Sequence, residues 1–395
     1  MRETADAVII GGGVIGASIA YHLAKRNFGR IVLLERASLA QGSTGRSVAT
    51  IDLLTLQIEA AELFARSGAF FQQFTELLGA DCGYVQTGSV ILAGPQQEDE
   101  LLAAIGHMQA AGVEVNPPTP EALALLEPMA DLTGVSAASY TAQGGYADPV
   151  LTTQAFAGAA RRLGAIIHQG RAVTGFRRQG NQISGVETEA GFIECPMVII
   201  AAGAWSIELL SWLEIKIELL PVLHPVVCLR RPADFGPAHH SLLDLTTGIY
   251  ARPEQGGLTL LGSINPRVGH DPTDPDLWEG HVSDDYILWT MERLIGRYPA
   301  LVNSTLCKGW CGVMTISPDW QPVIGQWPDR PGLFCATGFS GRGFQISPAT
   351  GDLLAGLICG EKQATTLLAP FTPTRFDNGR LLQTDAINKN FGLQG

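Results

Sequence analysis

The sequence predicts a mixed α/β protein in which a parallel-sheet domain is interleaved with a second, β-rich domain. Three observations lead to this expectation. An apolar run, a glycine-rich turn and a helical pattern open the chain at residues 7–26. Short strand-like segments alternate with helical ones through the middle of the chain, and residues 332–360 repeat the order of strand, glycine-rich turn and helix.

Length and composition favour a globular protein that binds a small molecule. The chain of 395 residues exceeds a typical single core, so about two domains are expected. Hydrophobic residues make up 46% and charged residues 16%, and the net charge of −12 disfavours nucleic acid and anionic lipid as partners. Seven scattered cysteines without a CxxC pair indicate reduced thiols in the cytoplasm, with no metal site. The mixed charges of residues 1–6 predict neither a signal peptide nor a membrane span at the start.

The first 35 residues predict a βαβ unit. Residues 7–10 and 30–35 are apolar runs typical of buried parallel strands, and residues 14–26 carry apolar side chains at helical spacing. Periodicity then predicts a helix over residues 53–80 and strands within 83–93. Further helices are expected at 96–111, 150–163 and 284–297, and strands forming a meander at 165–200.

These elements divide the chain into alternating pieces of two domains. The nucleotide-binding domain is expected to use residues 1–82, 144–220 and 326–395, and the β-rich substrate domain residues 83–143 and 221–325.

The glycine-rich turn has the spacing of a dinucleotide-binding fingerprint. Gly11, Gly13 and Gly16 form a GxGxxG between the first strand and the first helix, where bare backbone amides can approach a pyrophosphate. Glu35 ends the next strand, so its carboxylate can accept hydrogen bonds from a ribose diol and would repel a 2′-phosphate. The motif predicts an ADP-containing cofactor without choosing between NAD and FAD.

Four further motifs bear on the choice between NAD and FAD, because they carry a resemblance to a known protein family. QGSTGRS at 41–47, AAGAWS at 201–206, SPDWQPVIG at 317–325 and TGFSGRGFQISPATG at 337–351 follow the fingerprint in order. With them the chain resembles, over nearly its whole length, the glycine oxidase, sarcosine oxidase and D-amino acid oxidase family of flavoproteins. The resemblance implies FAD bound to a Rossmann-like domain of the glutathione-reductase type, and hydride removal from the carbon beside an amine nitrogen.

On the fingerprint and the resemblance together, a set of positions is expected to bind FAD. Ser43 and Thr44 would meet the pyrophosphate, the backbone of Val173 the adenine, and the stretch 338–345 the flavin. The full set is Gly11, Gly13, Val14, Ile15, Gly16, Glu35, Arg36, Ser43, Thr44, Val173, Ala202, Gly203, Gly338, Gly341, Arg342, Gly343, Phe344 and Gln345.

The chain departs from the family at three positions. Gly312, rather than the neighbouring Cys311, aligns with the cysteine that links FAD covalently in some relatives, so non-covalent FAD is expected. Leu260 takes the place of a lysine that speeds reaction with oxygen, which favours a dehydrogenase over an oxidase. Gln345 replaces a lysine that holds the substrate carboxylate in sarcosine oxidases. The SGRGFQ loop resembles that of catalytic subunits of hetero-oligomeric sarcosine, opine or proline dehydrogenases and of hydrogen cyanide synthase, and this resemblance implies a partner subunit.

Substrate binding needs a group for the carboxylate, and an arginine fork pairs both oxygens. Arg252, Arg342 and Arg46 are the candidates, with Arg252 favoured and Tyr250 as an orienting hydroxyl. His224, His239, His240 and His270 lie in the predicted substrate domain, and of these His224 is favoured to assist deprotonation of the amine.

Two alternatives stay open at this point. An NAD enzyme would use the fingerprint without a C-terminal flavin loop. A flavoprotein with a structural or RNA-modifying role would share the fold without this chemistry, although the acidic balance weighs against RNA. The sequence does not identify the amine, the electron acceptor or the oligomeric state.

Overall fold

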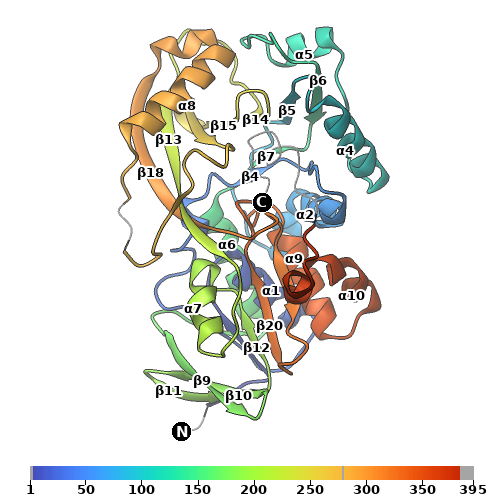
Figure 1. The fold of residues 1–395 in the computed structure, drawn as a ribbon, viewed down its shortest axis with the longest axis vertical. Coiled ribbons are helices and arrows are strands. Elements are labelled where there is room, and N and C mark those ends of the chain that lie inside the picture. The colour runs from blue at the N-terminus through green and yellow to red at the C-terminus, as the bar shows by residue number, and fades with distance from the viewer. Residues whose placement is uncertain (1–2, 278–279, 383–395) are drawn as a thin grey trace.

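The computed structural model describes residues 3–277 and 280–382, which form two sheet-based layers stacked end to end (Figure 1). The lower layer contains a six-stranded, mainly parallel sheet in the order β19-β20-β12-β2-β3-β8. Its strands are β2 (Ala7–Ile10), β3 (Ile31–Leu34), β8 (Ile166–His168), β12 (Val198–Ile200), β19 (Val323–Gln326) and β20 (Leu333–Thr337). They come from three separate stretches of the chain, and the last return to this sheet begins at Val323.

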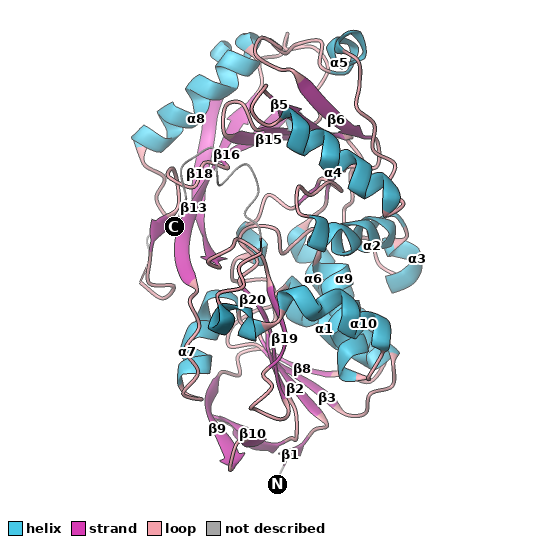
Figure 2. Cartoon of the chain, turned by 45° about the vertical axis from the view of Figure 1, so that its right-hand side comes forward, coloured by secondary structure: helices cyan, strands magenta, loops and turns pink. Residues whose placement is uncertain are grey.

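Helices cover one side of this sheet (Figure 2). They are α1 (Val14–Lys25), α2 (Ala61–Gln72), α3 (Phe74–Leu78), α6 (Pro149–Arg162), α9 (Ser347–Ile358) and α10 (Lys362–Leu368). Helices α1 and α9 approach so closely that a Cβ at Gly351 would lie 2.2 Å from Ser18 Oγ. Since helix α9 follows the C-terminal glycine-rich loop, this contact places that loop beside the N-terminal one.

The opposite side of the parallel sheet carries a small meander and a short helix. Strands β9 (Val173–Gln179), β10 (Gln182–Thr188) and β11 (Gly191–Glu194) are antiparallel, and β1 (Glu3–Thr4) pairs with β11. Leu209 and Leu210 of helix α7 (Ser206–Ser211) pack into one apolar cluster with residues of this meander.

The upper layer is an eight-stranded sheet with helix α8 (Asp284–Arg297) on its outer face (Figure 1). Helices α4 (Glu98–Ala110) and α5 (Pro120–Leu126) lie beside the edge of this sheet that β6 forms (Figure 1). The strands are β5 (Ser89–Ala93), β6 (Ala137–Thr141), β13 (Leu220–Arg230), β14 (Ser241–Asp244), β15 (Ile249–Glu254), β16 (Leu258–Ser263), β17 (Asp271–Pro272) and β18 (Thr305–Ile316). The inner face is turned toward the lower layer, so a site between the layers can draw residues from both.

Two predicted elements differ from those observed. The helix expected from residue 53 starts only at Ala61, because Leu53 has a left-handed backbone (φ 58°) and the chain before it forms strand β4 (Thr50–Ile51) with β7 (Gly145–Tyr146). Strand structure within 83–93 is confined to β5, since Val85 makes only an isolated bridge to Tyr146.

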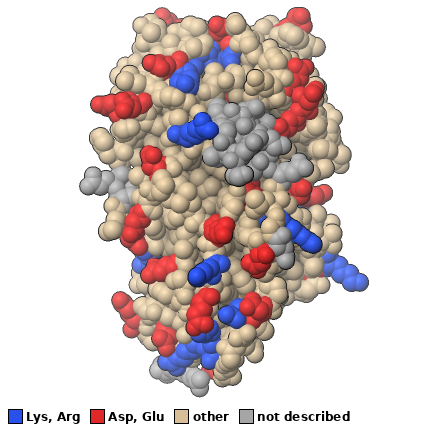
Figure 3. Space-filling model, viewed as in Figure 1, with Lys and Arg blue, Asp and Glu red and all other residues tan. Residues whose placement is uncertain are grey.

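On the face shown in Figure 3, acidic and basic side chains are interspersed, and this face has no basic patch. Within residues 3–277 and 280–382, every helix is too short or too polar to cross a lipid bilayer.

A buried ion pair fastens the C-terminal part of the chain to the SPDW turn. Arg375 donates from Nε to Asp319 Oδ2 (2.8 Å) and from Nη2 to Asp319 Oδ1 (2.9 Å), and both side chains are buried. Ser317 Oγ and the Gln321 amide also donate to Asp319 Oδ1. Buried charges are tolerated when each has such partners.

Arg375→Ala is therefore expected to lower the free energy of unfolding by about 3–5 kcal/mol, because it leaves the Asp319 carboxylate buried without a cation. A urea titration measures the loss. Arg66→Ala is the matched control, since Arg66 makes a partly exposed pair with Glu62 worth at most about 0.5 kcal/mol. Equal losses in the two variants would contradict the assignment.

Candidate functional site

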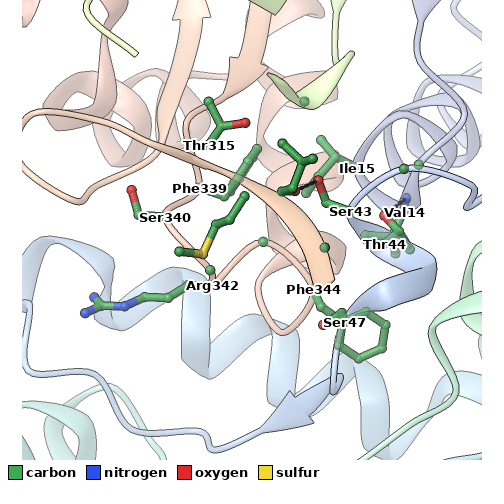
Figure 4. A pocket seen from close by; sticks show the side chains of 18 of the residues that line it. Val14, Ile15, Ser43, Thr44, Ser47, Thr315, Phe339, Ser340, Arg342 and Phe344 are labelled. Carbon is green, nitrogen blue, oxygen red and sulfur yellow. Dashed lines mark hydrogen bonds between the residues drawn. The ribbon is translucent and has the colours of Figure 1, made fainter. Parts of the chain in front are cut away.

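One large cavity lies between the two layers, with a volume of about 920 Å³. This is at the upper end of the range of roughly 300–1,000 Å³ that is usual for ligand pockets. The glycine-rich N-terminal turn, the segment 41–56, the strands β13 and β15 and the C-terminal loop 338–345 all contribute to its wall. Figure 4 shows Ser43 and Thr44 close to Val14 and Ile15, with Phe339, Ser340 and Arg342 across the cavity.

The three fingerprint glycines have different tasks. A Cβ at Gly11 (φ +114°) would lie 2.4 Å from the Ala201 carbonyl oxygen, and one at Gly16 would lie 1.9 Å from the Gly11 carbonyl oxygen. These two glycines allow the backbone to pack where strand meets helix. Gly13 borders the cavity, and a Cβ there would lie 3.1 Å from Thr44 Oγ1. Gly13 therefore keeps the start of α1 accessible to a ligand.

Glu35 is oriented by backbone amides. The Gly12 amide donates to Oε2 (2.7 Å) and the Ala37 amide to Oε1 (2.8 Å), and the side chain lines the cavity. A carboxylate has about four lone-pair sites, so capacity is left for two hydroxyls of a ribose. Next to Glu35, the Arg36 guanidinium lies 4.1 Å from the ring centre of Trp205, and both side chains donate to Asp276 Oδ1 at 2.9 Å.

The other expected cofactor positions also line this cavity. Thr44 Oγ1 accepts a hydrogen bond from the Val14 amide (3.2 Å), whereas the Ser43 hydroxyl donates to the Val313 carbonyl of β18. The cavity wall includes Ile15, Val173, Ala202, Gly203, Gly338, Gly341, Arg342, Gly343, Phe344 and Gln345. Gly338 (φ +65°) and Gly341 (φ +87°) need the left-handed region, which explains why this loop is rich in glycine.

The wall thus fits a dinucleotide cofactor such as FAD. It combines a carboxylate held for a diol, a side-chain-free helix start at α1, and a second glycine-rich loop leading into α9. Among residues 3–277 and 280–382, no group of three or more potential ligands is placed to hold a metal ion.

Two of the three expected substrate-binding residues meet at the cavity. His224 Nε2 and Tyr250 Oη are 3.0 Å apart, and both residues line the wall. His270 lies beside His224 with ring centres 5.0 Å apart, and Trp320 lies 5.6 Å from His270. Burial lowers the pKa of His224 to about 3 and that of His270 to about 4, so both imidazoles are neutral at pH 7.

Arg252, the favoured carboxylate clamp, is not among the residues that line the cavity. Its guanidinium lies 3.9 Å from the ring centre of Tyr146 and pairs with Glu254 (3.0 Å). Because Arg252 follows Tyr250 by two residues on the same strand, both side chains are expected to reach the cavity. The ring of Tyr146 in β7 instead covers the Arg252 guanidinium. Of the two other candidates, Arg46 lines the cavity while donating to the Gly42 carbonyl (3.1 Å), and Arg342 lines it from the flavin-type loop.

Sequence reasoning missed Asp52. This acid lines the cavity, where Ser89 Oγ donates to Asp52 Oδ1 (3.2 Å) and the Asp52 amide donates to Gln345 Oε1 (3.1 Å). Burial raises the pKa of its carboxyl to about 6. The available signal was a single acid inside the otherwise uncharged run VATIDLLTL.

The cavity wall contains no cysteine among the seven in the chain, all of which lie in its described part. Cys311 is buried in the cluster beneath α8 and its thiol donates to the His281 carbonyl, while the adjacent Gly312 faces the cavity. Leu260 packs with Val226 and Cys228, and no lysine among residues 3–277 and 280–382 lines the wall.

Comparison with known proteins agrees with this geometry. Residues 6–357 match the family described as FAD dependent oxidoreductase (DAO). The chain is 29% identical over 375 residues to mitochondrial sarcosine dehydrogenase of Mus musculus, covering 90% of the chain but 40% of that protein. It therefore spans about two fifths of this relative.

Other relatives are matched along their whole length. Glycine oxidase of Geobacillus kaustophilus is 27% identical over 389 residues, which covers 95% of the chain and 98% of the oxidase. The crystal structure of L-proline dehydrogenase from P. horikoshii has a TM-score of 0.88 and 28% identity, covering 96% of this chain and all of that one.

Gly13→Ala should abolish most FAD binding while the protein still folds, because the added methyl group enters the cavity at the start of α1 and meets only Thr44 Oγ1. Flavin content per protein and the thermal unfolding temperature of the apoprotein measure the two effects. Gly106→Ala, in the exposed interior of α4 with no atom within 4 Å of the new Cβ, is the control and should keep full flavin content. Full flavin content in Gly13→Ala would refute this role.

Proposed function

The chain belongs to the DAO family of FAD dependent oxidoreductases, and from this membership we propose that it oxidises a small amino acid or secondary amine at the carbon bonded to nitrogen. The observation that carries the proposal is that one continuous cavity is lined both by the dinucleotide fingerprint and by the polar side chains of Tyr250, His224 and Arg342. FAD is the cofactor of this family, so the NAD alternative has no support, and no observation favours a structural or RNA-modifying role.

The proposed substrate class follows from the wall chemistry and from the relatives. The curated and structural relatives named above act on sarcosine, glycine and L-proline by their names, and each of these molecules carries an amine next to a carboxylate. We assign the carboxylate to Arg342, which lines the cavity, in place of Arg252, which does not. The buried Tyr250 hydroxyl, whose pKa burial raises well above its usual value, stays neutral and can orient the same carboxylate.

The chemistry needs orientation more than strong acid or base groups. Bound FAD supplies the hydride acceptor. The protein has to hold the substrate with its Cα–H directed at that acceptor and to keep water away. Neutral His224, held by Tyr250, provides a hydrogen-bonding wall without adding a positive charge that would repel a cationic amine.

We further propose a dehydrogenase rather than an oxidase. A lysine beside the reduced flavin would stabilise developing superoxide. By the resemblance Leu260 takes the place of such a lysine, and no lysine among residues 3–277 and 280–382 lines the cavity. The electrons would then pass to a quinone, a dye or a partner flavoprotein.

The decisive experiment mixes the purified holoprotein with sarcosine, L-proline, glycine and D-amino acids without oxygen and follows loss of the flavin's visible absorption. At least one amine should bleach the flavin, and air should restore the colour slowly. Arg342→Ala should raise the substrate concentration needed for half-maximal reduction at least about tenfold, since a charge-assisted bidentate hydrogen bond is lost. Arg46→Ala serves as the comparison arginine. A flavin that no amine reduces would overturn the proposal.

FAD is proposed to be non-covalent, because none of the cysteines reaches the cavity. Acid precipitation of the holoprotein should release the yellow flavin into the supernatant, where its fluorescence and chromatographic behaviour identify it as FAD. Flavin that stays with the precipitate after denaturation would show a covalent link and would direct attention to His224 and His270, which do line the cavity.

A further inference from the structure

Asp52 differs in its partners from the buried acids of this protein. Asp244 pairs with Arg297 (2.8 Å) and Asp319 with Arg375 (2.8 Å), and both carboxylates are fully buried. Glu127 receives hydrogen bonds from His240 Nδ1 (2.8 Å) and Tyr298 Oη (2.9 Å). These three acids stabilise the fold away from the cavity.

Asp52 has hydrogen bonds but no ion pair. Ser89 donates to its Oδ1, and Thr50 also hydrogen-bonds to the carboxylate. In the part of the chain that the structure describes, no basic side chain forms an ion pair with Asp52. The side chain is only partly buried, and it faces the cavity that it lines. The positive charge of Arg342 acts on Asp52 without a direct ion pair, so a cationic ligand group beside Asp52 would give this partly desolvated carboxylate the direct partner that the other buried acids have.

The position of Asp52 fits a substrate group. Ser89 begins β5, and β5 pairs with β14, which pairs with β15 at Tyr250. Tyr250 therefore lies two strands away from β5, roughly 10 Å across the sheet, and Ile91 and Leu243 between them line the cavity. From the other side, Gln345 connects Asp52 to the loop that carries Arg342. Asp52 and Arg342 thus place opposite charges on one small part of the wall, as a zwitterion requires.

We propose, on the basis of the function proposed above, that Asp52 binds the amine nitrogen of the substrate and accepts the proton that this nitrogen loses before oxidation. The N–H bond of the ammonium group breaks, its proton moves to an Asp52 carboxylate oxygen, and its electron pair remains on nitrogen. The Cα–H bond then breaks with its electron pair leaving as hydride for the bound FAD, and the nitrogen lone pair forms the C=N bond of the iminium product. The substrate class is therefore an amino acid that arrives as a zwitterion.

The surroundings of Asp52 support this role. Burial raises the pKa of its carboxyl to about 6, while Ser89, Thr50 and the positive charge of Arg342 lower it in part. A carboxylate with a raised pKa is a better proton acceptor than an ordinary aspartate. The other titratable groups on the facing wall, His224, His270 and Tyr250, are neutral at pH 7, so Asp52 supplies the negative charge there.

The first test compares Asp52→Asn with the wild-type holoprotein on two matched ligand pairs. Sarcosine and butanoate differ in that a CH₂ replaces the amine, as do L-proline and cyclopentanecarboxylate. Changes in the flavin's visible absorption, measured without oxygen, give binding and reduction. In Asp52→Asn, reduction should slow at least about 100-fold and amine binding should weaken, whereas the amine-free acids should bind as tightly as before or more tightly. Asp99→Asn, at an exposed acid of α4 that does not line the cavity, is the control and should behave as wild type.

The pH dependence gives a second readout. The wild-type rate of flavin reduction should fall as pH drops through about 6, because Asp52 becomes protonated, and this acidic limb should be absent in Asp52→Asn. Ser89→Ala removes a hydrogen bond that lowers the pKa of Asp52, so the limb should move to higher pH. Unchanged profiles in both variants would overturn the inference.

Stability supplies a readout independent of turnover. The folded pKa of Asp52, about 6, lies above its ordinary value of 3.8. Its ionisation therefore destabilises the fold, with full stability present below pH 3.8 and lost as pH rises through about 6. Asp52→Asn should unfold at a higher temperature than wild type at pH 8, and the difference should shrink by pH 4.5. A variant less stable than wild type at pH 8 would show that Asp52 is structural.

The outcomes separate the two proposals. If amines bind the wild-type protein through Asp52 but do not bleach the flavin, the proposed function fails and the amine site stands. If amines bleach the flavin equally well in Asp52→Asn, the amine site fails and the proposed function stands. If none of sarcosine, L-proline, glycine and the D-amino acids binds the wild-type protein, both fail.

Discussion

The close approach of three backbone segments at the carboxyl end of the parallel sheet is the constraint on which this structure depends. Gly16 packs against the Gly11 carbonyl and Gly11 packs against the Ala201 carbonyl, so the end of β2, the start of α1 and the end of β12 meet without side chains between them. Any larger residue would separate the strands from the helix. Because the segments meet here, the amides at the start of α1 face the cavity, and Glu35 at the end of β3 is close enough to accept from the Gly12 amide.

The second layer is attached around this point by contacts that are distant in sequence. Ser43 donates to the Val313 carbonyl, β4 pairs with β7, and Asp276 accepts from both Arg36 and Trp205. The contacts of Val313 and Asp276 join the cofactor side of the cavity to the substrate side, and the β4–β7 pairing fixes the segment that carries Asp52 between them. The interleaving of the chain therefore has a physical result, since a single cavity is enclosed by two layers that neither half of the sequence could form alone.

Local patterns predicted the parts of the site that depend on neighbouring residues. Gly11, Gly13, Glu35 and the loop 338–345 line the cavity because backbone geometry within a strand, turn and helix places them there, and Gly16 packs directly behind Gly11. Arg252 was placed wrongly at the cavity because Tyr146, more than a hundred residues earlier in the chain, covers its guanidinium. Asp52 was missed because the leucines after it suggested a helix, whereas Leu53 takes a left-handed backbone and β4 pairs with β7. The contact of Tyr146 with Arg252 and the pairing of β4 with β7 join residues far apart in the sequence, so local patterns cannot predict them.

The distribution of buried charge links stability to chemistry in this molecule. Where a carboxylate serves the fold, as in Asp244 and Asp319, an arginine fork lies within 3 Å and additional donors fill the remaining lone pairs. At Asp52 the protein supplies hydroxyl donors and the charge of Arg342, but it leaves the position of a direct ion-pair partner to the cavity. Pairing Asp52 internally would stabilise the fold and would also neutralise the charge that a cationic amine can bind. A carboxylate without a direct ion-pair partner is therefore better explained by a ligand that enters the cavity than by a role in holding the two layers together.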